Sequence, residues 1–180
     1  MADEAGWERL TLAALAARLG VRQPSLYKHI EGIDGLRRSI GVAAKDELAG
    51  ILARAAAGRA RGDAIVSIAR AYRAWALLHP GRYAVMQRAP AAGDAQDEAA
   101  SRAIVQVILD VLAGFELRDD DATDATRALR SALHGFVALE TGGGFGLPAD
   151  IDRSFDRLVR GLARAFSGWA EEPVAARSRT

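Results

Sequence analysis

Apolar residues recur every three or four positions along almost the whole chain, and this spacing limits the possible folds more than any other feature. One such series is Ile65, Ile68, Tyr72 and Trp75. Because an α-helix turns once in about 3.6 residues, residues spaced in this way share one helix face, whereas a strand would alternate apolar and polar residues. No stretch alternates convincingly. The pattern predicts an all-α protein with about eight helices.

Helix-breaking residues fall between the apolar stripes, as they should if each stripe is one helix. Pro80 follows one stripe, and a glycine-rich stretch at 142–148 separates two others. The acidic run at 119–121 suits the start of a helix, because carboxylates stabilise the positive end of the helix dipole. We expect an N-terminal domain, a helical domain and a flexible tail, at residues 1–45, 46–170 and 171–180.

The composition excludes several classes of protein. The 180 residues include no cysteine and no apolar run of 18 residues, so we expect no disulfide, no thiolate metal site and no membrane span. The first residues are acidic and do not resemble a secretory signal. We therefore expect the protein to lie in the cytoplasm. The three histidines lack metal-ligand spacing, and no P-loop or nucleophile elbow is present. We therefore expect neither a cofactor nor an enzyme.

The most informative segment, TLAALAARLGVRQPSLYKHI, begins at Thr11. Its first residue can cap a short helix through the hydroxyl group, and Gly20 suits the left-handed turn that ends this helix. Pro24 can start a second helix, where its missing N–H costs nothing. Leu26 and Ile30, four residues apart, then point inward while their neighbours point outward. This arrangement predicts a helix-turn-helix.

Apolar side chains are expected to hold the two short helices together. Leu12, Leu15, Ala16 and Leu19 form one stripe on the first helix, and Ala16 is small where the second helix must cross closely. Val21 is expected to fill the corner between the helices.

Positive charge is concentrated around the same segment. Residues 18–38 hold five lysines and arginines against two acidic residues, an excess of three positive charges. Such an excess suits a surface that faces DNA, although an ordinary solvated face could carry the same charge.

In these residues the chain resembles the tetracycline-repressor (TetR) family of bacterial transcription regulators. The family signature reads roughly "G…lT…lA…lGvs…lY.hF…K..L", and the residues that match it in place and spacing are Gly6, Thr11, Leu15, Ala16, Leu19, Gly20, Val21, Leu26, Tyr27 and His29. The resemblance implies a homodimeric regulator, more often a repressor, that binds a double-stranded DNA operator. It also implies release by a small-molecule effector bound in the C-terminal helical domain.

The resemblance gives individual residues a role at the DNA. Thr11, Tyr27 and His29 match positions that touch phosphates, which fix position without identifying bases. Gln23, Pro24, Ser25 and Lys28 match positions where the recognition helix meets base edges and the backbone. Gln23 and Ser25 are expected to identify bases, and Lys28 could contact either a base or a phosphate. The residues expected at DNA are Thr11, Arg22, Gln23, Pro24, Ser25, Tyr27, Lys28, His29 and Arg37.

The chain departs from the family pattern in three places. Ile30 replaces a phenylalanine, and Ile33 stands where a lysine is common, so that one phosphate contact is either missing or supplied by Arg37 or Arg38. The family's first helix would precede Gly6, where only five residues stand. Either the start of the chain is misplaced or the DNA-binding bundle lacks its first helix, and we favour the former.

The C-terminal part resembles the WHG type of TetR ligand domain. The motif HPGRYAVM begins at His79 and LHGFVALE begins at Leu133, without the tryptophan often found in the second motif. We expect dimerisation through helices near 122–140 and 150–169. Side chains that could line an effector pocket, or could equally be ordinary core, are Tyr72, Trp75, His79, Tyr83, Met86, Gln87, His134, Phe136 and Phe145.

Two other functions stay open at this point. A helical ligand-binding or adaptor protein that has lost DNA binding would also fit the departures at the N-terminus. An all-α enzyme is disfavoured because no acid, base and nucleophile grouping is present.

Overall fold

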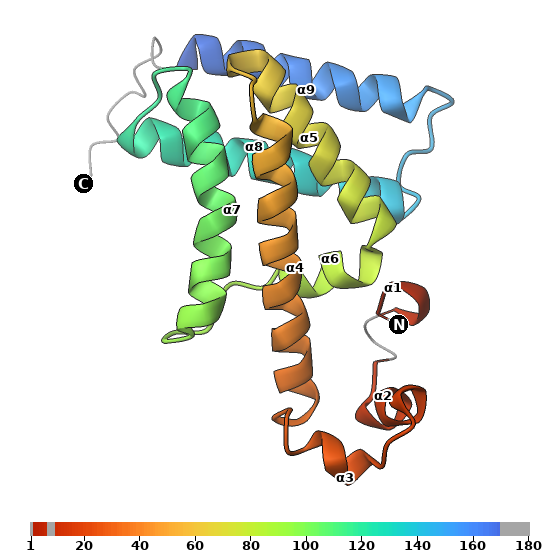
Figure 1. Ribbon diagram of the computed structural model, residues 1–180. Coiled ribbons are helices and arrows are strands. Elements are labelled where there is room, and N and C mark those ends of the chain that lie inside the picture. Colours follow the sequence, from red (N-terminus) through yellow and green to blue (C-terminus); the bar gives the residue numbers. More distant parts are fainter. Residues whose placement is uncertain (1, 7–9, 170–180) are drawn as a thin grey trace, which may run out of the picture. The chain divides into compact units, whose positions relative to one another are not determined.

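The computed structural model describes residues 2–6 and 10–169. Within these residues all regular structure is helical and there is no strand, so the predicted all-α fold is confirmed (Figure 1). The helices are α1 (Ala2–Ala5), α2 (Leu12–Leu19), α3 (Gln23–Leu26), α4 (Gly32–Ala56), α5 (Arg61–Leu78), α6 (Pro80–Met86), α7 (Ala95–Ala113), α8 (Asp119–Thr141) and α9 (Ile151–Ser167).

The chain divides into two compact units. The first unit comprises Met1–Leu52 with Tyr72–Val105, and the second comprises Ala53–Ala71 with Gln106–Thr180. The domain boundary predicted near residue 45 falls inside α4 and stays a prediction. The tail predicted at 171–180 lies outside the described residues.

The short helices α2 and α3 form from the local signals that predict them. Thr11 is the N-cap of α2, and its side-chain oxygen accepts a hydrogen bond from the backbone N–H of Ala14 at 3.1 Å. Gly20 ends α2 in the left-handed conformation, with φ at 66°. At this φ a side chain would strain the backbone, so glycine stabilises the turn. Leu12, Ala16 and Leu26 form the buried core between α2 and α3.

Three expectations about this segment are wrong. The regular helix α3 ends at Leu26, and residues 27–29 form a turn, although the Ile30 N–H still donates to the Leu26 carbonyl at 3.0 Å. Val21 does not fill the corner, because its side chain is 44% exposed, and Leu19 is 58% exposed. The Val21 backbone N–H instead donates to the Ala16 carbonyl at 3.0 Å, which helps to end α2.

In the first unit, α4 is tied to the start of α7 by two ion pairs. The Lys45 ammonium is almost fully buried and lies 2.5 Å from an Asp97 carboxylate oxygen. Two turns earlier, the Arg38 guanidinium donates two hydrogen bonds to the Asp94 carboxylate, which lowers the pKa of that carboxyl to about 2. Arg38 is therefore paired within the protein, and the expectation that Arg37 or Arg38 supplies a phosphate contact stays a prediction.

The second unit has its own aromatic core around α8 and α9. Asp150 caps α9 by accepting from the backbone N–H groups of Asp152 and Arg153 at 2.8 and 3.2 Å. Phe155 is 1% exposed, and its ring centroid lies 5.0 Å from that of Phe136 on α8. The side chains that α9 buries are Phe155, Val159, Ala163 and Phe166.

We predict that Lys45 and Asp97 stabilise the fold only when both are present. Removing one partner, as in Asp97→Leu or Lys45→Met, leaves the other charge buried and should lower the free energy of unfolding by about 3–5 kcal/mol. The double variant Lys45→Met/Asp97→Leu should recover much of that stability. Urea unfolding of the four proteins measures the coupling. Additive effects of the single changes would show that the two side chains do not stabilise each other.

Candidate nucleic-acid interface

The segment from Arg22 to His29 is exposed at every position except Leu26, and most of its exposed side chains are polar. Leu26 is buried at 7% exposure and holds α3 against α2. Tyr27 is 58% exposed although it is aromatic, so its ring and hydroxyl group face solvent. All of the residues predicted to meet DNA from this segment are exposed: Arg22, Gln23, Pro24, Ser25, Tyr27, Lys28 and His29.

The positive charges near this surface are not equally available. Arg18 lies 2.8 Å from the Glu4 carboxylate, and Arg37 lies 3.5 Å from that of Asp34. Arg22 and Lys28 form no ion pair with any of the described residues. Cations of this kind beside exposed hydrogen-bonding groups are the combination that binds a phosphate backbone and adjacent base edges.

Thr11 lies at the edge of this surface, at the start of α2. Its oxygen accepts from the Ala14 N–H, so the hydroxyl hydrogen can still be donated to an acceptor such as a phosphate. Arg37 belongs to α4, and its side chain is 25% exposed. The structure thus keeps Thr11 and the α3 residues accessible but leaves Arg37 partly covered.

Several residues predicted to line an effector pocket gather in the first unit, where α5 leads into α6. The Tyr72 and Tyr83 hydroxyl groups lie 2.8 Å apart, and both residues are buried. Trp75 is 4% exposed and its indole N–H donates to Glu47 at 3.2 Å. These aromatic residues are packed and hydrogen-bonded within the unit.

A charged network adjoins Trp75. The Arg82 guanidinium lies 5.7 Å from the Trp75 ring centroid and 2.8 Å from an Asp3 carboxylate oxygen. Burial alone would raise the pKa of Asp3, but hydrogen bonds from the Arg82 backbone and side chain outweigh burial and lower it. His79 joins the same network, with its Nδ1 3.3 Å from Asp3.

Met86 and Gln87 close this group at the end of α6. Met86 is 7% exposed. The Gln87 side-chain nitrogen is buried and has no hydrogen-bond partner among the described residues. A buried amide donor without a partner costs about 1–3 kcal/mol, so a bound acceptor would stabilise it.

The remaining predicted pocket residues belong to the second unit. His134, Phe136 and Phe145 follow the chain through α8 and the connection to α9. The Phe136 and Phe145 rings are 4.8 Å apart. A single pocket that includes residues of both groups therefore stays a prediction.

The sequence analysis did not identify Glu47 and Arg82 as part of this arrangement. Glu47 lies on α4, 28 positions before Trp75, and no local spacing connects the two. Arg82 lies inside the HPGRYAVM motif, but nothing there distinguishes it from an ordinary surface arginine. Only the packing of α4, α5 and α6 brings these charges to the tryptophan.

Among the described residues, no helix is long and apolar enough to cross a membrane. The same residues contain no group of three or more histidines, aspartates or glutamates placed to hold a metal ion.

The chain is similar to known regulators over most of its length. A family model described as "Tetracyclin repressor-like, C-terminal domain" matches residues 65–162. The HTH-type transcriptional regulator Rv0681 of Mycobacterium tuberculosis is 41% identical over 162 residues, covering 89% of this chain and 74% of that protein. The regulator YobS of Bacillus subtilis is 34% identical over 163 residues, covering 89% and 83%.

Solved structures agree with these relatives. The protein SCO4313, described as regulatory, superimposes with a TM-score of 0.72 at 28% identity, over 89% of this chain and 88% of the other. A protein of unknown function from Rhodococcus sp. RHA1 has the same TM-score at 23% identity, over 94% and 88%, and supports the fold alone. The WHG subtype stays a prediction. The chain belongs to the tetracyclin-repressor-like (TetR) family of HTH-type transcriptional regulators.

Proposed function

We propose that this regulator is a repressor that binds a DNA operator through the Arg22–His29 surface and leaves it when a small-molecule effector binds. The observation that carries the proposal is the exposure of every predicted DNA-contacting side chain on this surface. Two of them, Arg22 and Lys28, are cations that pair with no described residue. Such a regulator acts in the compartment that holds the chromosome, the cytoplasm. In this proposal residues 1–45 bind DNA and 46–170 bind effector and partner.

A homodimer would place two of these surfaces in successive major grooves, about 34 Å apart along the DNA. A change of a few ångströms in that spacing prevents both from docking at once. The effector must bind one arrangement of the helices more tightly than the other, because a ligand with equal affinity for both does not change their populations.

For the effector site, we place the pocket among Tyr72, Trp75, Tyr83, Met86 and Gln87 in the first unit. The aromatic residues and Met86 are buried and packed together, so an effector that enters this core would meet apolar side chains, and the Gln87 amide would offer it a buried donor without a partner among the described residues. These groups fit an apolar molecule that carries one hydrogen-bond acceptor.

For the dimer, we propose the surface formed by α8 and α9. Ile151, Leu158 and Leu162 on α9 are only half-buried within the chain, and Leu139 on α8 is 52% exposed. A second copy would cover these side chains, as a stable interface of more than about 1,000 Å² requires.

Variants of the Arg22–His29 surface should separate phosphate contacts from base recognition. Tyr27→Phe and His29→Ala should weaken binding to all duplexes about equally. Ser25→Ala and Gln23→Ala should lower the ratio of specific to non-specific affinity, because each removes hydrogen bonds to a base edge that are worth on the order of 1–3 kcal/mol. Fluorescence anisotropy with a duplex selected from a random library, and with a scrambled one, measures both.

Lys28→Ala should reduce the slope of log K against log salt by about one per subunit if Lys28 neutralises a phosphate. Arg54→Ala, which removes an exposed charge elsewhere on α4, serves as the matched control and should leave the slope unchanged. Wild-type protein that binds no duplex would refute the DNA-binding proposal and favour a helical ligand-binding protein.

Gln87→Met tests the effector site without removing an apolar wall. The change keeps the length of the side chain and removes the buried amide, so the unliganded protein should be at least as stable as wild type. Compounds that raise the melting temperature of the wild type should bind the variant at least tenfold more weakly. Unchanged affinity in calorimetric titration would mean that Gln87 does not contact the effector.

Charges on the α9 face should prevent dimerisation. Leu158→Asp together with Leu162→Asp places two carboxylates in the proposed interface, and sedimentation should then report a monomer or an aggregate. The control Arg157→Asp changes an exposed neighbour on the same helix. A double variant that sediments as a dimer would exclude this interface.

A further inference from the structure

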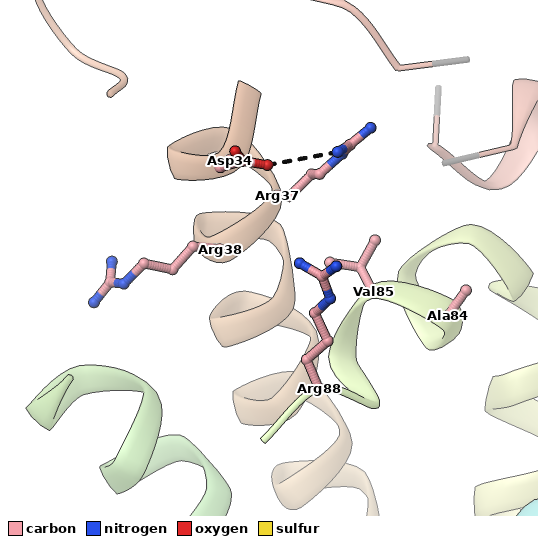
Figure 2. A pocket seen from close by; sticks show the side chains of 6 residues that line it. All are labelled: Asp34, Arg37, Arg38, Ala84, Val85 and Arg88. Atoms are coloured by element: carbon pink, nitrogen blue, oxygen red, sulfur yellow. Dashed lines mark ion pairs between the residues drawn. The ribbon is translucent and has the colours of Figure 1, made fainter. Parts of the chain in front are cut away.

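The first unit contains a small pocket between the N-terminal turns of α4 and the end of α6. Its volume is about 130 Å³, and Figure 2 shows the side chains that line it: Asp34, Arg37, Arg38, Ala84, Val85 and Arg88. The two helices meet one turn further along α4, where the buried Gly41 packs against Val85. The pocket thus lies where α4 and α6 are already held together.

Three arginines and one carboxylate are the charged residues that line this pocket. The Arg38 guanidinium is held by Asp94, and its side chain extends away from Arg37 and Arg88 in Figure 2. Arg37 pairs with Asp34, whose side chain is 84% exposed. Arg88 forms no ion pair with the residues that the structure describes. Its guanidinium therefore adds a further positive charge to the lining of the pocket, between α4 and α6 (Figure 2).

The backbone of Arg88 is fixed in place. Its carbonyl oxygen accepts a hydrogen bond from the buried Lys45 ammonium at 3.1 Å. Lys45 is in turn paired with Asp97, so the residue that carries the extra guanidinium is anchored to the ion pair between α4 and α7. An anchored backbone limits how far the Arg88 side chain can withdraw from the pocket, and such support lowers the cost of binding an ion there.

We propose that Arg37 and Arg88 bind a phosphate-type oxyanion in this pocket. A volume of about 130 Å³ is below the ~300–1,000 Å³ of pockets that take drug-sized molecules, but it suits a small tetrahedral anion. Guanidinium groups match the oxygens of such an anion in pairs, and the lining of this pocket holds three arginines and one carboxylate. The phosphate could belong to the DNA backbone or to a free ion.

The free-ion source is tested without DNA. Thermal unfolding in sodium phosphate and in sodium chloride of equal ionic strength compares the wild type with Arg88→Gln, Arg88→Lys and the control Arg54→Gln. Saturating phosphate should raise the melting temperature of the wild type and of Arg54→Gln by about 2–4 °C. Arg88→Gln should not show this shift, and Arg88→Lys should keep only part of it, because it retains the charge but not the planar fork.

The DNA source rests on the proposed DNA binding and is tested with a selected duplex. If a backbone phosphate occupies the pocket, Arg88→Gln should reduce the slope of log K against log salt by about one per subunit, and Arg54→Gln should not. Either result specific to Arg88 supports the site and identifies its source. A phosphate shift and a salt slope that both match the wild type in Arg88→Gln would overturn the proposal. If the wild type binds no DNA, the phosphate measurement alone decides, so the two proposals can fail separately.

Discussion

The buried ion pair between Lys45 and Asp97 is the interaction on which much of the first unit depends. A lysine at 4% exposure is tolerated only with a carboxylate and other hydrogen-bond acceptors beside its ammonium group. Lys45 donates to the Asp97 carboxylate at the start of α7 and to the Arg88 carbonyl just after α6. One side chain of α4 thereby fixes the positions of two other helix ends.

The same principle organises the residues around Trp75. Glu47 accepts from the Trp75 indole and from Arg82, so a carboxylate on α4 supports both the aromatic residue and the arginine beside it. Polar groups that satisfy one another hold α4, α5 and α6 in one arrangement, and this arrangement positions the tyrosine pair and Gln87. The exposed Arg22–His29 surface, in contrast, keeps its side chains accessible to an external partner.

The helix-turn-helix could be predicted from the sequence because its helix ends depend on interactions between neighbouring residues. The Thr11 cap and the left-handed Gly20 each depend on residues within four positions along the chain, and both are confirmed. The exposure of Leu19 and Val21 was not predictable, because burial depends on which other element reaches them. The Arg38–Asp94 pair joins residues 56 positions apart. The spacing of apolar residues along a helix gives no information about contacts between residues so far apart in the sequence. The sequence also could not show that the predicted effector residues belong to two different units, because that depends on contacts between distant segments.

The Arg38–Asp94 pair also limits which signals can reach α4. A carboxyl group with a folded-state pKa of about 2, below its ordinary value of 3.8, stabilises the fold above the ordinary value, and that contribution disappears only as the pH falls toward 2. Ordinary cellular pH lies far above that range. At cellular pH this pair therefore stays charged and keeps its full contribution, and acid weakens it only below the ordinary pKa of an aspartate.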